Sequence, residues 1–187
     1  MGHPARALQS LYEQFASVPN HLVAEIIRGT VVTQPRPAPK HARAASVLGM
    51  RLGGPFDLGE GGPGGWLILD EPEVHLDTHI LVPDLAGWRR ERMSALPDAA
   101  HFELAPDWIC EVLSPGTQAI DRADKMPIYA EHEVRHAWLL DPLAHMLEVY
   151  RLDRGRWLQL AIWRGAQRVR AEPFDEIELD LSALWAL

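Results

Sequence analysis

Apolar residues recur along the chain with two periods, one typical of helices and one typical of strands. Leu8, Leu11, Tyr12 and Phe15 follow helical spacing, whereas segments after residue 65 alternate or run continuously apolar. We therefore expect helices at residues 7–17, 41–52 and 127–134, a hairpin at 21–33, and strands at 66–69, 73–76, 80–82, 107–113, 136–140, 147–150 and 157–163. This order predicts an α/β (α+β) fold with a mixed β-sheet.

Glycine and proline mark the connections between these elements. Residues 53–65 contain seven glycines and two prolines, which predicts a loop, and residues 88–105 read as a second connecting segment. Proline is tolerated only near a helix start, so Pro127 predicts a loop over 117–125 that enters a helix near residue 127. An earlier helix start is the alternative, because Asp121, Lys125 and Tyr129 would then share one helix face.

Length and composition narrow the class of protein. The 187 residues predict one domain, with an N-terminal helix over 1–20 and a core over 21–187. A single cysteine excludes an internal disulfide, and the nine histidines lack the HxH or HExxH spacing of zinc enzymes. No apolar run is long enough for a membrane span and Met1–Ser10 has no signal-peptide core, so we expect a cytoplasmic protein.

Charge is distributed unevenly along the chain. The net charge of −8 does not by itself indicate a nucleic-acid binder. However, no acidic residue lies between Glu25 and Asp57, and a run of basic residues falls there. We expect Arg28, Lys40 and Arg43 of this run to contact nucleic-acid phosphates at the rim of an acidic site. A chance run on a solvated face is an equally good explanation.

Two acidic residues and a lysine carry the strongest functional signal. Asp84 follows Pro83 at the end of an apolar strand, and Glu111 interrupts the apolar run 107–113. Glutamate is rarely buried unless it is paired or binds a metal, so Glu111 predicts a cavity-facing site. Lys125, one of only two lysines, follows fourteen residues later. Two carboxylates that hold a hard cation, with an ammonium beside them, are what metal-dependent phosphodiester hydrolysis requires. Each residue also has a structural alternative. Asp84 would cap the next element, Glu111 would bond to backbone amides at a strand end, and Lys125 would be an ordinary surface lysine.

Two further residues belong to this hypothesis with weaker support. Glu25 interrupts the apolar hairpin segment 22–27, so the burial argument applies to it as well, and a solvent-facing strand edge is the alternative. His41 stands at a helix start, where it would contact phosphate or simply be exposed.

Taken together and in order, several segments resemble the Uma family of restriction-endonuclease-like proteins, a bacterial branch of the PD-(D/E)XK nuclease superfamily. These segments are Ala24–Gly29, Pro39–His41, Leu81–Asp84, Ala105–Pro115, Asp121–Lys125, Tyr129–Ala130, Val134–Asp141 and Leu147–Tyr150. The resemblance extends from about Leu22 to Leu184, which is nearly the whole chain.

The resemblance implies a mixed sheet with helices on both faces and a Mg²⁺ or Mn²⁺ ion held by Asp84, Glu111 and the carbonyl of Val112. In the superfamily pattern a lysine stands two residues after the second acid, and that position is Leu113 here. In this branch Lys125 would take its place, and Glu25 would add an acidic group to the same cavity.

The first hypothesis is therefore a Mg²⁺-dependent endonuclease that hydrolyses phosphodiester bonds in DNA. A non-catalytic binding or scaffold protein with the same fold is the main alternative, favoured by the acidic charge and by Leu113. An enzyme that acts on a small anionic metabolite is a third hypothesis.

The late tryptophans predict a homodimer. Trp157 and Trp163 share a predicted strand face with small and polar residues, so we expect them to anchor an interface between two copies of the chain. The alternative is that these tryptophans cap the ends of one sheet.

Overall fold

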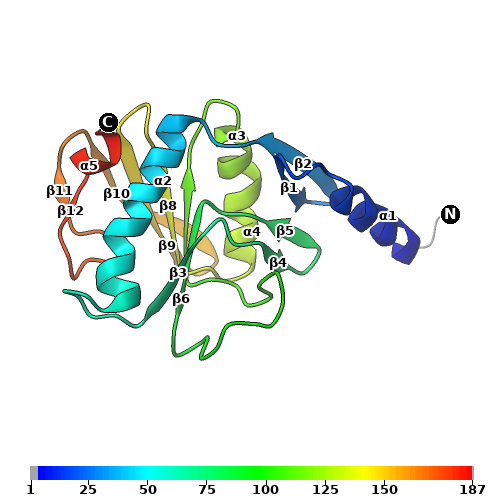
Figure 1. The fold of residues 1–187 in the computed structure, drawn as a ribbon, viewed down its shortest axis with the longest axis horizontal. Helices are drawn as coiled ribbons and strands as arrows, with labels where there is room; N and C mark the ends of the chain where they lie inside the picture. Colours follow the sequence, from blue (N-terminus) through cyan, green and yellow to red (C-terminus); the bar gives the residue numbers. More distant parts are fainter. Residues whose placement is uncertain (1–3, 187) are drawn as a thin grey trace.

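The computed structural model describes residues 4–186 and contains two main sheets with helices packed around the larger one (Figure 1). The helical elements are α1 (Pro4–Ala16), α2 (Pro39–Leu52), η1 (Gly53–Leu58), α3 (Gln118–Ile120), η2 (Asp121–Lys125), α4 (Met126–Glu131) and α5 (Ser182–Trp185). The strands are β1 (Leu22–Ile27), β2 (Thr30–Pro35), β3 (Trp66–Asp70), β4 (Val74–Leu76), β5 (His79–Leu81), β6 (Leu85–Arg89), β7 (Trp108–Val112), β8 (His136–Asp141), β9 (Met146–Asp153), β10 (Arg156–Arg164), β11 (Arg168–Val169) and β12 (Leu179–Asp180).

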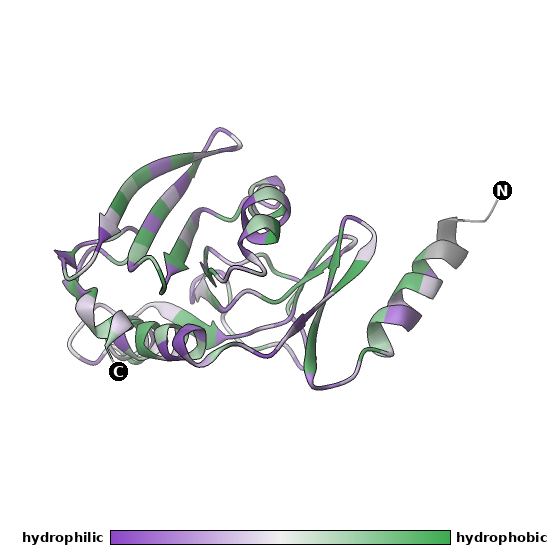
Figure 2. Cartoon of the chain, turned by 90° about the horizontal axis from the view of Figure 1, so that it is seen from above, coloured by the Kyte–Doolittle hydropathy of each residue, from purple (hydrophilic) through white to green (hydrophobic). Residues whose placement is uncertain are grey.

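The larger sheet is mixed, as the sequence predicts. Its six strands follow the order β10-β9-β8-β7-β6-β3, in which β7 and β8 run parallel and every other pair runs antiparallel. Helices α2 and α5 cover one face, and α4 covers the other (Figures 1 and 2). Among the described helices, none combines the length and apolar character needed to cross a bilayer.

The central strand β7 sends alternate side chains into two different cores. Trp108, Cys110 and Val112 pack in the cluster that includes α2, whereas Ile109 and Leu113 pack with α4. Because strand side chains alternate, Glu111 shares the α4 face with Ile109 and Leu113. This face turns the carboxylate toward the helical segment that carries Lys125.

The second sheet is antiparallel and has the order β2-β1-β5-β4. Strands β1 and β2 form the predicted hairpin, and Arg28 and Gly29 at its turn both have positive φ, as a two-residue turn between twisted strands requires. The chain passes from β5 to β6 of the larger sheet through Pro83 and Asp84. Asp84 therefore lies at the junction between the two sheets. Helix α1 extends away from the rest of the chain beside the β1–β2 hairpin (Figures 1 and 2).

The expectation of a loop over residues 117–125 is wrong. Helical turns begin at Gln118 and continue through η2 into α4, which is the alternative that the i, i+4, i+8 spacing left open. The turn before Pro127 is a wide π-type turn, in which the Met126 N–H donates to the carbonyl of Asp121. A wide turn relieves the clash that a proline ring makes with an α-helix, so Pro127 does not mark the helix start.

Two other segments also differ from the sequence expectations. Residues 53–58 of the predicted glycine-rich loop form the π-type turn η1. Strand β6 was missed, because Gly87 interrupts its strand pattern and the segment after residue 88 read as a connection. Gly87 is needed there, since an added Cβ would lie 3.2 Å from ring carbons of both Trp66 and Trp108.

The tryptophans that suggested a homodimer pack within the chain. A β-bulge between Gln159 and Ala161 breaks the alternation of β10, so Trp157 packs with the α4 cluster and Trp163 with the α2 cluster. The expectation that both share one face is therefore wrong. The homodimer stays a prediction without their support. Light scattering checks it: a dimer has twice the chain mass of 21.0 kDa, and a particle of one chain mass contradicts it.

Candidate functional site

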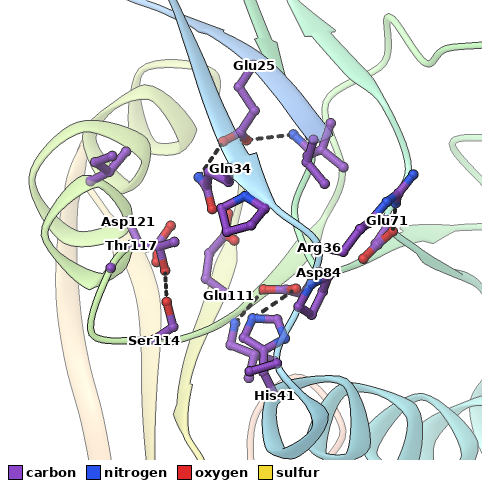
Figure 3. A pocket seen from close by; sticks show the side chains of 18 of the residues that line it. Glu25, Gln34, Arg36, His41, Glu71, Asp84, Glu111, Ser114, Thr117 and Asp121 are labelled. Carbon is purple, nitrogen blue, oxygen red and sulfur yellow. Dashed lines mark hydrogen bonds and ion pairs between the residues drawn. The ribbon is translucent and has the colours of Figure 1, made fainter. Parts of the chain in front are cut away.

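A cavity of about 470 Å³ lies where the two sheets meet (Figure 3). The β1–β2 hairpin, the start of α2, the end of β7 and the α3–η2 turns surround it. Its lining includes Glu25, His41, Asp84, Glu111, Asp121 and Lys125. Groups from segments a hundred residues apart in the sequence therefore face a single space.

Asp84 binds the end of β7 and still faces the cavity. Its Oδ2 accepts the Val112 N–H at 2.7 Å, which fixes the carboxylate beside Glu111. Its Oδ1 lies 3.3 Å from Nε2 of His41. The Asp84 side chain is 16% exposed, so it is not completely buried. The proximity of Asp84 raises the pKa of His41 above its ordinary value, against the opposing effect of burial. Asp84 thus both caps a strand and faces the cavity.

Glu111 is buried and held through one of its two oxygens. Oε1 accepts a hydrogen bond of 2.6 Å from the Tyr129 hydroxyl and lies 2.8 Å from Lys125 Nζ. Tyr129 stands one turn after Lys125 on the helical segment, so both donors reach the same oxygen. Among the described residues, no hydrogen bond uses Oε2 and that atom is not sealed from solvent, so it remains available to a ligand in the cavity.

Lys125 is the cationic centre of the site and is itself buried. Besides Glu111, its Nζ lies 2.9 Å from Oε1 of Glu25 and 3.8 Å from Oδ1 of Asp121. Asp121 precedes Lys125 by one helical turn, and Glu25 comes from β1 of the other sheet. The ammonium therefore links the two sheets at the floor of the cavity.

Glu25 is bound on both sides of its carboxylate. Oε1 accepts the Val82 N–H at 2.8 Å as well as the Lys125 contact, and Oε2 accepts from the Gln34 amide at 3.2 Å. Only 1% of Glu25 is exposed. The alternative that Glu25 lies on a solvent-facing strand edge is therefore wrong. With its oxygens occupied by these donors, Glu25 holds Lys125 in place.

The charges of the cavity do not balance within it. Five acids line it, Glu25, Glu71, Asp84, Glu111 and Asp121, against the two cations Arg36 and Lys125, with His41 beside Asp84. Burial raises the pKa of Glu111 well above its ordinary value, and the neighbouring acids raise it further while Lys125 lowers it. Burial also raises the pKa of Asp121. Burial opposes the charge of Lys125, but Glu111 and Glu25 outweigh it and raise the pKa of Lys125 well above its ordinary value.

This arrangement fits a hard divalent cation. Asp84 Oδ1 and Glu111 Oε2 are carboxylate oxygens at the cavity surface, and oxygen is the donor that such cations prefer. A cation there would offset the excess of negative charge and favour the ionised form of Glu111. Asp84 and Glu111, with the backbone of Val112 beside them, are the residues that could hold it.

The structure brings some predicted residues to the cavity and leaves others outside. Asp84, Glu111, Lys125, Glu25, Val112 and His41 all line it. Arg28, Lys40 and Arg43 do not. Arg28 at the hairpin turn pairs with Glu131 at 2.9 Å, and the Arg43 side chain donates to the Ala186 carbonyl at 3.4 Å. Arg36, from the same basic run, lines the cavity instead and pairs with Glu71.

Two buried residues of the site were not assigned to it from the sequence. Asp121 neighbours Lys125, and Tyr129 donates to Glu111. The signal was present as the i, i+4, i+8 spacing of Asp121, Lys125 and Tyr129, but the position of Pro127 argued against a helix through all three. His41 lies beside Asp84 at the cavity, and its contact with phosphate stays a prediction.

Comparisons with known proteins show the fold and the family of the chain. A crystal structure from Anabaena variabilis ATCC 29413, described as a putative nuclease belonging to DUF820, superimposes with a TM-score of 0.69 at 22% identity, covering 94% of this chain and 96% of that one. This likeness shows the fold. A search of curated proteins found no match. The sequence pattern of the Uma2 family, described as "Putative restriction endonuclease", matches residues 10–182. The chain therefore belongs to the Uma2 family.

Proposed function

We propose that the protein is a Mg²⁺-dependent endonuclease that hydrolyses phosphodiester bonds in DNA. The observation that carries the proposal is the joint placement of Asp84, Glu111 and Lys125 at one cavity, with the ammonium 2.8 Å from the Glu111 carboxylate. The nuclease descriptions of the family and of the Anabaena protein support the same reaction.

The side chains of the cavity would divide the work as follows. Asp84 and Glu111 hold Mg²⁺, which lowers the pKa of water and offsets negative charge on the phosphate. Lys125 would fix Glu111 and donate to groups that gain negative charge. Glu25 and Asp121 hold the ammonium in position, which makes them positioning residues.

Lys125 would replace the lysine that the superfamily pattern puts two residues after Glu111. That position, Leu113, is 2% exposed and packs in the α4 cluster. A lysine there would bury its charge among apolar side chains. The helical turn η2 would supply the ammonium from the next element along the chain instead, which supports a catalytic site despite Leu113.

A nuclease assay tests the proposal directly. With Mg²⁺ we expect cleavage of plasmid or linear DNA by the wild-type chain, and Asp84→Asn should lower the rate at least about a thousandfold, since metal binding contributes several kcal/mol to the transition state. The matched control is Glu176→Gln, at an exposed acid outside the cavity, which should cut at the wild-type rate.

The outcome of this assay separates the hypotheses. DNA that is bound but not cut by the wild-type chain in Mg²⁺ or Mn²⁺ would contradict the nuclease and favour the scaffold. Absence of DNA binding together with Mg²⁺ binding at the cavity would favour a small anionic substrate.

DNA binding itself should depend strongly on salt. Arg36 lines the cavity with 58% of its side chain exposed, and Lys40 stands at the exposed start of α2. If both contact phosphates, Arg36→Ala with Lys40→Ala should lower the slope of log affinity against log salt by about 2. Arg154→Ala, outside the cavity lining, is the control. Affinity that is indifferent to salt, or unchanged in the double variant, would contradict this surface.

A further inference from the structure

A second cluster of metal-ligand side chains lies outside the cavity, where β4 meets the segment 101–103. The two segments form a parallel bridge at Val74 and Phe102. The His75 N–H donates to the Phe102 carbonyl at 2.8 Å, and the Phe102 N–H donates to the Glu73 carbonyl at 2.9 Å. The bridge fixes the register of Glu73-Val-His75 against His101-Phe-Glu103.

The bridge sorts the side chains of the two segments onto opposite faces. Val74 is fully buried, and Phe102 stacks on Trp88 with ring centroids 4.6 Å apart, so these two face the core. Because strand side chains alternate, their neighbours face outward together. The outward set is Glu73, His75, His101 and Glu103. Two imidazoles and two carboxylates thus share one face.

The donor atoms of this set are close together. One ligand atom from each of Glu73, His75 and His101 lies within 4.8 Å of the others. His75 Nε2 is 2.7 Å from Glu73 Oε1, and the imidazoles of His75 and His101 stack with centroids 3.9 Å apart. Glu103 Oε1 lies 3.8 Å from His101 Nε2. Each side chain is partly exposed, so a dissolved ion can reach the group.

We propose that Glu73, His75 and His101 form a zinc site, with Glu103 as a fourth ligand. Imidazole nitrogen and carboxylate oxygen are ligands of zinc, which they hold at about 2.0–2.2 Å in a tetrahedron, so donor atoms end up about 3.3–3.6 Å apart. The donor atoms of Glu73, His75 and His101 now lie within 4.8 Å of one another, so rotations of these partly exposed side chains would bring them to that spacing. Mg²⁺ disfavours imidazole, which makes this site chemically distinct from the Asp84–Glu111 cavity.

Zinc at this position would fasten a long connection. The chain between β6 and β7, residues 90–107, contains no described helix or strand, and His101 and Glu103 lie within it. Zinc would join this connection to β4 of the smaller sheet. Since β6 and β7 neighbour each other in the larger sheet, the ion would act as a structural clamp between the sheets.

Calorimetric titration of Zn²⁺ into the full chain without a histidine tag tests the proposal. We expect one bound zinc per chain, and His101→Ala or Glu73→Gln should weaken binding at least about tenfold, since even outer groups around a metal contribute that much. His21→Ala, at an exposed histidine outside the cluster, and Glu111→Gln, in the cavity, should leave zinc binding unchanged.

Hydrogen exchange gives a second readout that a change in the cavity would not produce. Zinc should slow amide exchange in residues 90–105 of the wild-type chain and of Glu111→Gln, and not of His75→Ala or His101→Ala. The proposal is overturned if the wild-type chain binds no zinc. It is equally overturned if Glu111→Gln abolishes zinc binding while His101→Ala keeps it.

Discussion

Replacing Lys125 with methionine should destabilise the protein by about 3–5 kcal/mol near neutral pH, because it leaves buried carboxylates without their partner. Lys125 lies within 3 Å of Glu25 and of Glu111, and each of the three residues is at most 2% exposed. Methionine fills a volume similar to that of lysine, so the loss of stability comes from removing the charge and not from creating a cavity. Urea unfolding of both chains measures it, and Lys40→Met, at an exposed position, is the matched control.

The loss in Lys125→Met should grow with pH. Lys125 lowers the pKa of Glu111, so its removal raises that pKa further above the unfolded value. A carboxyl whose folded pKa is raised adds stability below its unfolded pKa and loses it as the pH rises through the folded pKa. The variant should therefore be closer to wild type at about pH 5 than at about pH 8. A loss under about 1 kcal/mol at both pH values would contradict the role of Lys125 at the centre of the site.

Glu111→Gln should abolish the stabilisation of the protein by Mg²⁺. Glutamine keeps an oxygen for Tyr129 and Lys125 and places an amide where Oε2 faces the cavity. At a Mg²⁺ concentration about tenfold above Kd, binding adds about 1.4 kcal/mol to the wild-type chain, which is a rise of roughly 3–6 °C in Tm. Thermal melting with and without Mg²⁺ measures this rise.

Glu176→Gln removes the same charge at an exposed position and should keep the full Mg²⁺ response. An equal rise in Tm for Glu111→Gln and the wild-type chain would place the cation elsewhere. No rise in any chain would leave the nuclease hypothesis without its metal.

The central strand and its glutamate could be predicted from the sequence, whereas contacts through the helix could not. A charged residue inside a continuous apolar run is rare enough to identify Glu111 and its face. Tyr129 and Asp121 were missed because proline is normally a reliable helix-start signal, and the π-type turn at Asp121–Lys125 cancels that signal. No signal in this sequence predicts which helical turns are of the wider π type.

The errors in β6 and β10 have a related cause. Gly87 is placed by two tryptophan rings that come from other strands, and the bulge in β10 shifts the face of every later side chain. Both depend on partners that are distant in the sequence. The Glu73–His75–His101 cluster could not be predicted for the same reason. Its histidines are brought together by a bridge between two segments and not by a local spacing in the sequence.

Mn²⁺ soaked into crystals of the wild-type chain, followed by an anomalous difference map, tests the central claim most directly. The nuclease hypothesis predicts a peak in the cavity, with oxygens of Asp84 and Glu111 at about 2.1 Å from the ion. A map with no peak beside an ordered Asp84 and Glu111, or with a peak at the Glu73–His75–His101 cluster alone, would contradict it.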